Sequence, residues 1–120
     1  MLLFKPEHVP LILDGTKTQT RRFWKRCRVK VGSVHQARTN MPWQDPSGHF
    51  ANIVIHDWYE QTLAHMAQWE VEAEGYRTRR EYMDALAAIN RRELTGWEEV
   101  WVVDFEVDSV PDTGEVTDAT

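Results

Sequence analysis

The chain has 120 residues, of which 42% are hydrophobic and 28% are charged, and its formal net charge is −5. This length fits one domain and excludes a separate catalytic domain beside a binding domain. No apolar run approaches the roughly 20 residues of a membrane-spanning helix, and the first residues lack the basic-then-apolar order of a signal peptide, so we expect a cytoplasmic protein with no membrane partner.

The N-terminal part of the chain predicts three strands and one short helix. Residues 2–5 are apolar and have the pattern of an edge strand, and Pro6 opens a helical segment that continues to residue 13. Gly15 fits the end of this helix, because glycine adopts a positive φ without steric cost. Residues 16–22 and 29–39 are rich in β-branched side chains, which indicates two further strands.

The remainder of the chain predicts a loop, two strands and two helices. Residues 41–48 contain two prolines and a Ser-Gly pair, which argue against regular structure. Residues 50–59 have the pattern of a strand and residues 64–74 that of a helix, and Thr78 opens a second helix through a capping-box pattern. Residues 98–107 alternate between apolar and polar side chains and give the clearest strand in the sequence.

The order of these elements predicts an α+β fold in a single domain over residues 1–109. Closure of the last strand on the early ones would make a small mixed β-barrel with flanking helices. Residues 110–120 form an acidic tail without periodicity, and we expect this tail to be disordered.

Charge is strongly segregated along the chain, because residues 15–44 contain no acidic residue. The basic residues of this segment are Lys17, Arg21, Arg22, Lys25, Arg26, Arg28, Lys30 and Arg38. A locally basic surface on an acidic protein attracts phosphate or a nucleic-acid backbone. Alternatively, these bases form salt bridges with the acidic flanking segments, and charge counts alone leave both interpretations open.

The octapeptide at residues 15–22, Gly-Thr-Lys-Thr-Gln-Thr-Arg-Arg, resembles the signature G-x-K-x-x-E-x-R of the ASCH family. Gly15, Lys17 and Arg22 match this signature, while Thr20 stands where the family usually has glutamate. The resemblance extends over about residues 2–107. It implies a PUA-like mixed β-barrel with flanking helices, the same fold class that the element order predicts.

The threonine at position 20 resembles a subset of the family, the small amidohydrolases that remove the acyl group from N4-acetylcytidine. This subset uses a lysine, that threonine and a later glutamate, and residues 73–76 resemble the segment that carries the glutamate. The resemblance implies a metal-independent hydrolase of N4-acylated cytidine or cytosine nucleosides. Lys17 would be the base, Thr20 the nucleophile and Glu74 the residue that orients Lys17.

Chemistry supports these roles in part. A threonine hydroxyl needs a neighbouring base before it can attack an amide, and burial or nearby cations can lower the pKa of a lysine enough for that task. Arg21 and Arg22 lie in the same segment and would bind the substrate. In a regular strand, however, residues 17 and 20 point to opposite faces, so the proposed site requires a bulge or a looped start.

Two other interpretations remain open at this point. In one, the chain is an RNA- or DNA-binding PUA-like module in which Lys17, Arg22 and the rest of the basic segment 17–30 hold phosphates, with Glu74 a solvated helix residue and Thr20 an ordinary strand residue. An ASCH-type ribonuclease is a weaker alternative. The five histidines form no ligand pattern, so we expect no metal and no cofactor. The sequence does not define an oligomeric state.

Overall fold

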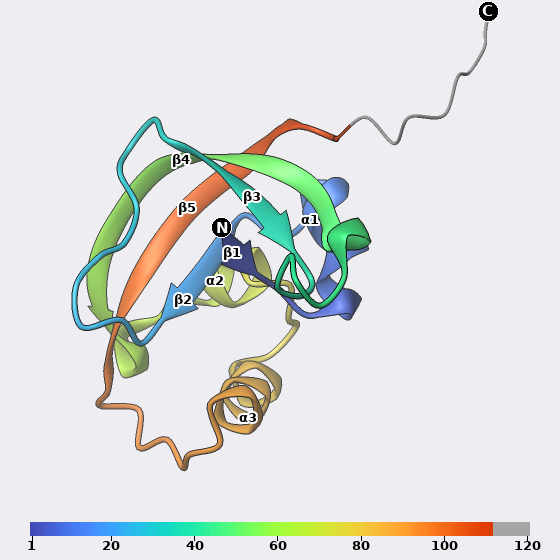
Figure 1. Ribbon diagram of the computed structural model, residues 1–120. Helices are drawn as coiled ribbons and strands as arrows, with labels where there is room; N and C mark the ends of the chain where they lie inside the picture. Colours follow the sequence, from blue (N-terminus) through green and yellow to red (C-terminus); the bar gives the residue numbers. More distant parts are fainter. Residues whose placement is uncertain (112–120) are drawn as a thin grey trace, which may run out of the picture.

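The computed structural model describes residues 1–111, so most of the predicted tail, residues 112–120, lies outside the described residues. The described chain forms one sheet with helices around it (Figure 1). Its strands are β1 (Leu2–Leu3), β2 (Gln19–Arg22), β3 (Val34–Arg38), β4 (His49–Thr62) and β5 (Glu99–Ser109). Its α-helices are α1 (Val9–Leu13), α2 (Gln68–Ala73) and α3 (Arg79–Asn90), and the 3₁₀ turns are Pro6–His8, Pro46–Gly48 and Leu63–His65.

The sheet has the strand order β1-β3-β4-β5-β2 and curls into a half-barrel (Figure 1). The short β1 pairs parallel with β3, and every other neighbouring pair is antiparallel. β1 and β2 are therefore the two edges of the sheet, and the barrel remains open along a seam between them. The mixed sheet and the α+β class predicted from the sequence are confirmed.

The two long strands form the back of the half-barrel. The register of β4 against β5 shifts twice, between Asn52 and Ile53 and between Ile55 and Asp57, and such bulges increase the bend and twist of a strand. Ile53 and Ile55 of β4 and Phe105 of β5 are buried. They belong to a core that also holds Leu2, Phe4, Ile12, Val29, Ala37, Ala51 and Val103.

A second core cluster lies under α2 and α3. It comprises Leu63, Met66, Val71, Tyr82, Leu86, Val100 and Val102. The helix expected over residues 64–74 is shorter than predicted, because Met66 and Ala67 adopt extended backbone angles between the 3₁₀ turn at Leu63–His65 and α2. The next helix, α3, begins at its predicted cap, where the Thr78 side chain accepts a hydrogen bond from the Glu81 N–H.

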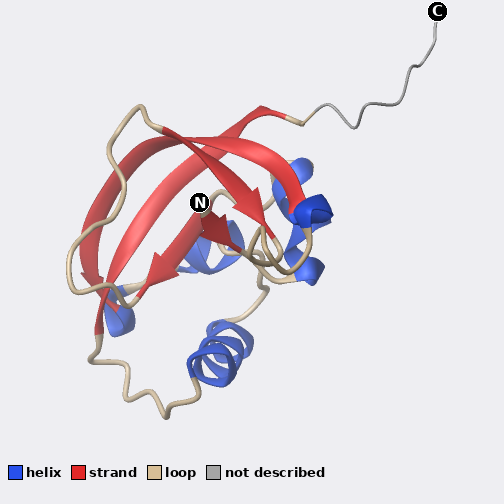
Figure 2. Ribbon diagram, in the orientation of Figure 1, coloured by secondary structure: helices blue, strands red, loops and turns tan. Residues whose placement is uncertain are grey.

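Figure 2 shows the helices gathered at the ends and the open side of the strands. Within residues 1–111, no helix combines the length and the hydrophobicity required to cross a bilayer. Side chains of α3 lie beside the seam between β1 and β2, and the candidate site is located there.

Candidate active site

The approach to β2 resolves the problem of side-chain direction at residues 17 and 20. Gly15 ends α1 with a φ of 83°, as the sequence predicts. The N–H groups of Lys17 and Thr18 then donate to the carbonyl oxygens of Leu11 and Ala73, at 2.9 and 2.8 Å, rather than to a neighbouring strand. The ladder with β5 begins only at Gln19. Lys17 therefore lies in a looped start, and the strand alternation does not apply to it.

Lys17 and Glu74 form a fully buried ion pair, with only 2% and 3% of their surfaces exposed. Lys17 Nζ lies 2.6 Å from Glu74 Oε1 and donates further hydrogen bonds to the carbonyl oxygens of Glu74 and Gln19, each at 2.9 Å. All three protons of the ammonium group therefore have acceptors. The contact with the Glu74 carbonyl also satisfies an oxygen at the end of α2, where a cation is favourable.

Gly75 makes this pairing sterically feasible. Its φ is 97°, which ends α2 in a conformation that other residues rarely adopt. A side chain added at Gly75 would approach Leu11 Cδ1 to 3.0 Å and would lie 3.9 Å from the Lys17 side chain. The glycine that follows Glu74 therefore lets the end of α2 pack closely against the segment that carries Lys17.

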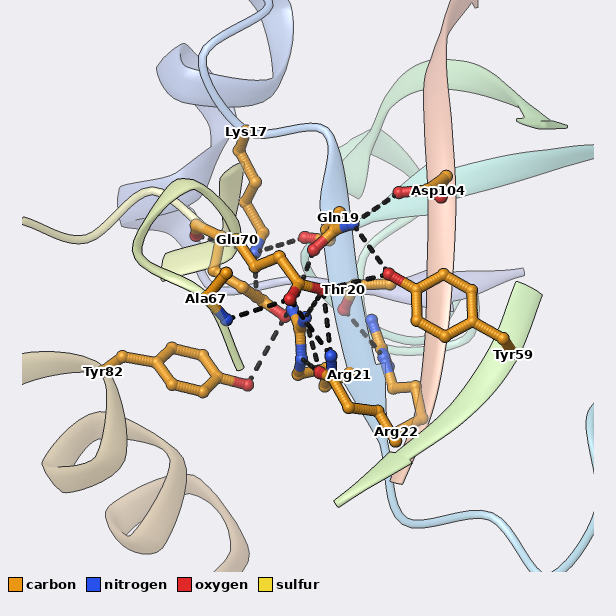
Figure 3. A network of polar contacts seen from close by, with 12 residues as sticks. Lys17, Gln19, Thr20, Arg21, Arg22, Tyr59, Ala67, Glu70, Tyr82 and Asp104 are labelled. Carbon is orange, nitrogen blue, oxygen red and sulfur yellow. Dashed lines mark hydrogen bonds and ion pairs between the residues drawn. The ribbon is translucent and has the colours of Figure 1, made fainter. Parts of the chain in front are cut away.

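Arg21 extends the ion pair into a buried network (Figure 3). Arg21 Nη1 donates to Glu74 Oε2 at 3.0 Å, and Nη2 donates to Glu70 Oε2 at 2.8 Å. Gln61 accepts two further bonds from the same guanidinium group, and Tyr82 donates to Glu74 Oε2 at 3.4 Å. Two cations, Lys17 and Arg21, thus balance two carboxylates in a region where an unpaired charge would be costly.

The surroundings shift the pKa values of the buried groups. Burial lowers the pKa of the Lys17 amine below its usual value, and the Glu74 carboxylate only partly offsets this effect. Burial would raise the pKa of Glu70, but hydrogen bonds from Ala67 and other neighbours, together with the charge of Arg21, bring it below the usual value. Burial, aided by the charge of Lys17, lowers the pKa of His8 to about 4.

A cavity of about 540 Å³ opens at the seam between the edge strands. Lys17, Thr20 and Glu74 all line this cavity, so the structure brings the three predicted catalytic residues to one place. Its walls also include Phe4 after β1, Trp24 after β2, and apolar side chains of α3. The Thr20 side chain is buried at 5% exposure, and within residues 1–111 no direct hydrogen bond joins it to Lys17.

Arg22 bridges the seam. Its Nε donates to Thr20 Oγ1 at 3.1 Å, and its Nη2 donates across the opening to the carbonyl oxygen of Leu3 at 2.7 Å. The guanidinium group also lies over the Phe4 ring, 5.1 Å from its centroid. Among the described residues Arg22 forms no salt bridge, unlike Arg21, and its guanidinium group lines the cavity.

Comparison with known proteins identifies the fold. No family model matches the chain, and no curated protein matches its sequence. Solved structures do match. An ASCH domain from Lactobacillus crispatus is similar with a TM-score of 0.57 and 14% identity, over 82% of this chain and 69% of that one. A mutant of the ASCH protein from Zymomonas mobilis is similar with a TM-score of 0.61 and 13% identity, over 91% of this chain and 69% of that one.

The chain has the ASCH-domain fold. An Enterococcus faecalis protein of the DUF984 family has a similar structure, with a TM-score of 0.65 and 16% identity over 87% of this chain and 68% of that protein. The fold implied by the resemblance of residues 15–22 to the ASCH signature is thereby confirmed. On this ASCH fold the signature segment supplies both the looped approach to β2 and the edge of the open seam.

Several residues of the ASCH-fold site were not predicted from the sequence. Glu70 is the most important, since it accepts hydrogen bonds from Arg21, Gln61 and Tyr59 and from the N–H of Ala67. One signal could have indicated it: Glu70 and Glu74 are four residues apart, so on a helix both carboxylates lie on the same face. Gln61 and Tyr59 carry no such signal, because they come from the distant β4.

Arg21 and Arg22, both predicted to bind substrate, differ in what they offer. The guanidinium group of Arg21 is engaged by Glu70, Glu74 and Gln61, whereas Arg22 keeps donor capacity toward the cavity. Within residues 1–111, no three His, Cys, Asp or Glu side chains gather in a way that could hold a metal ion. The polar groups that line the cavity include the amine of Lys17, the hydroxyl of Thr20, the carboxylate of Glu74, the guanidinium groups of Arg21 and Arg22, the imidazole of His8 and the phenols of Tyr76 and Tyr82.

Proposed function

We propose that this protein is an amidohydrolase that removes the acyl group from N4-acylated cytidine or cytosine nucleosides. The observation that carries the proposal is the convergence of Lys17, Thr20 and Glu74 on one cavity, with Lys17 and Glu74 paired at 2.6 Å. A nucleophile, a base and a group that orients the base are the components that amide hydrolysis requires. The cavity volume of about 540 Å³ lies within the range of small-molecule sites.

In the proposed reaction, Thr20 Oγ1 attacks the acyl carbonyl carbon and its proton passes to the neutral amine of Lys17. The tetrahedral intermediate collapses, the bond between carbon and the cytosine nitrogen breaks, and the departing amine takes the proton from Lys17. Water then attacks the acyl ester on Thr20, with Lys17 again accepting and returning a proton. The products are cytidine and a carboxylic acid, and both Thr20 and Lys17 return to their starting states.

The protonation state of Lys17 is the critical requirement. A lysine that acts as a base must first lose a proton, and burial lowers its pKa in that direction. Glu74 Oε1, at 2.6 Å from Nζ, is the nearest acceptor for this proton. Lys17 and Thr20 are not directly hydrogen bonded in the described chain, and catalytic contacts of this kind often form only when substrate is bound.

Arg22 completes the proposed site. Its hydrogen bond to Thr20 Oγ1 holds the hydroxyl in place and favours the negatively charged form of that oxygen. Donor capacity left on the guanidinium group would stabilise the oxyanion that forms on the acyl carbonyl. Arg21, in contrast, is a positioning residue, because it acts on the reaction through Glu74.

Release of cytidine from N4-acetylcytidine tests the proposal. Purified protein should convert the substrate to cytidine and acetate, and Thr20→Ala should lose at least about two powers of ten in kcat/KM. Thr62→Ala is a matched control, because Thr62 ends β4 and does not line the cavity. Equal turnover by Thr20→Ala and Thr62→Ala would refute the assigned nucleophile, and absence of turnover by the wild type would refute the proposed reaction.

The binding-module alternative has one observation in its favour. Lys25, Arg26, Arg28 and Lys30 are exposed, and among the described residues none of them forms a salt bridge. The other explanation of the basic segment, pairing with acidic residues, applies to Lys17 and Arg21 but not to these four. A nucleic acid would meet unpaired charge at this loop.

A further inference from the structure

A second cavity adjoins the first one at the seam. It has a volume of about 430 Å³ and is lined by the N-terminal residues 1–3 together with Arg28, Val29, His35 and Met41. Leu3, Arg22 and Trp24 line both cavities, so these three residues form the boundary between them. The hydrogen bond from Arg22 Nη2 to the Leu3 carbonyl oxygen lies at this boundary, so a ligand that extends from the first cavity into the second would contact Arg22.

The second cavity is suited to an anion beside an aromatic ring. Its lining contains two arginines, Arg22 and Arg28, and no acidic residue. The Arg28 guanidinium group lies 5.9 Å from the centroid of the Trp24 ring. The backbone at Trp24 is fixed, because its carbonyl oxygen accepts a hydrogen bond of 3.0 Å from the indole N–H of Trp101. Tryptophan rings and guanidinium planes are the surfaces on which unpaired bases stack.

Arg22 provides an independent indication of the ligand's charge. It is a half-buried cation at the boundary of both cavities, it forms no salt bridge among residues 1–111, and its hydrogen bonds reach only Leu3 and Thr20. A cation in such a place gains from an anionic ligand, and a phosphate accepts the forked donors of a guanidinium group.

We infer that the second cavity binds the nucleotide next to the acylated cytidine, so that the preferred substrate is a single-stranded polynucleotide rather than a free nucleoside. This inference rests on the proposed function. The acylated base would occupy the first cavity, the linking phosphate would lie at Arg22, and the neighbouring base would stack at Trp24 and Arg28. The exposed cations of residues 25–30 would then face the continuing phosphate backbone.

The inference is tested by binding and turnover measured on the same variants. The probes are a short single-stranded RNA with one central N4-acetylcytidine, the same RNA without the acetyl group, N4-acetylcytidine, and N4-acetylcytidine 5′-monophosphate. Arg28→Gln alters only the second cavity. Arg80→Gln is the matched control, because Arg80 is an exposed arginine on α3 that lines neither cavity.

Arg28→Gln should weaken binding of the unacetylated RNA and lower kcat/KM on the acetylated RNA by roughly tenfold, the effect of one lost charge-assisted contact. Turnover of N4-acetylcytidine should be unchanged, and Arg80→Gln should match the wild type on every probe. The wild type should also prefer the acetylated RNA to both small substrates. Equal behaviour of Arg28→Gln and Arg80→Gln on RNA would overturn the inference. A wild-type kcat/KM on N4-acetylcytidine 5′-monophosphate that equals or exceeds the value on the acetylated RNA would overturn it too.

The proposed amidohydrolase and the polynucleotide subsite can be refuted separately. If RNA binds in an Arg28-dependent manner but no acetylated probe is hydrolysed, the subsite is supported and the proposed amidohydrolase is refuted. If N4-acetylcytidine is hydrolysed but RNA neither binds nor reacts, the amidohydrolase is supported and the polynucleotide subsite is overturned.

Discussion

The basic segment contains two groups of cations that differ in almost every physical respect. Lys17 and Arg21 are buried and paired with Glu74 and Glu70, within a network that has no net charge. The cations of residues 25–30 are exposed, and no carboxylate of the described chain pairs with them. Residues a few positions apart in an acid-free stretch thus have different surroundings: the first group is buried in an ion-pair network beside the cavity, and the second is exposed to solvent.

The largest effect is expected at the buried lysine. Lys17→Arg keeps the positive charge but removes the ability to accept a proton, so kcat/KM on N4-acetylcytidine should fall by about two to four powers of ten. Lys17→Met, which removes the charge but keeps a similar length, should be equally inactive. Lys25→Arg, the corresponding change in the exposed group, should leave turnover unchanged. Near-normal turnover by a folded Lys17→Arg protein would refute the role of Lys17 as base.

Loss of the buried guanidinium group should have the next largest effect, on stability. Arg21→Met leaves Glu70 and Glu74 buried with too little positive charge, and such a change costs about 3–5 kcal/mol of unfolding free energy. Arg28→Met should cost less than about 0.5 kcal/mol, as surface changes do. Urea unfolding followed by circular dichroism measures both values. Equal stability of the two variants would mean that the network contributes nothing to the folded state.

Stability should also depend on pH through His8, which donates to or accepts from Tyr76 Oη at 3.1 Å beside the cavity. Its pKa falls from 6.5 to about 4 on folding, so between these values the unfolded state binds more protons. The unfolding free energy should therefore decrease as the pH falls from 6.5 toward 4. His8→Gln should flatten this part of the curve relative to the wild type. A His8→Gln protein that keeps the wild-type slope would contradict the assigned cause.

The smallest effect concerns salt. Replacement of Lys25, Arg26 and Lys30 by glutamine should leave the unfolding midpoint close to that of the wild type. If all three contact phosphates, the logarithmic salt slope for single-stranded RNA should decrease by up to about 0.7 for each lost contact. Fluorescence anisotropy at several salt concentrations measures the slope. An unchanged slope would show that the exposed cations do not contact the phosphate backbone.

Local patterns in the sequence predicted much of the fold. The helix start at Thr78, whose side chain accepts from the Glu81 N–H, and the helix stop at Gly15 occur as expected, and the strand predicted over residues 98–107 is β5 (Glu99–Ser109). The helix before Gly75 was predicted too long, because residues 66 and 67 are extended and no turn residue marks them. The pairing of β5 with β2 was predicted only on the general ground that a final strand needs a partner strand.

The candidate site was predictable only where the motif or the helix period carried a signal. Lys17, Thr20 and Glu74 were identified by resemblance, and the structure brings them to one cavity, while their roles remain predictions. A regular strand alternation would separate Lys17 from Thr20, and the sequence does not show that the N–H groups of residues 17 and 18 donate to α1 and α2 instead. The partners Gln61 and Tyr59 depend on long-range packing, which no local pattern encodes.

The most direct test of the central claim is to detect the acyl group on Thr20 during turnover. Wild-type protein mixed with excess N4-acetylcytidine should be quenched in acid at successive times, digested and analysed by mass spectrometry, with Thr20→Ala as the control. The account predicts one acetyl group on the peptide that contains Thr20 in the wild type and none in the variant. Continued release of cytidine while that peptide stays unmodified at every time would contradict it.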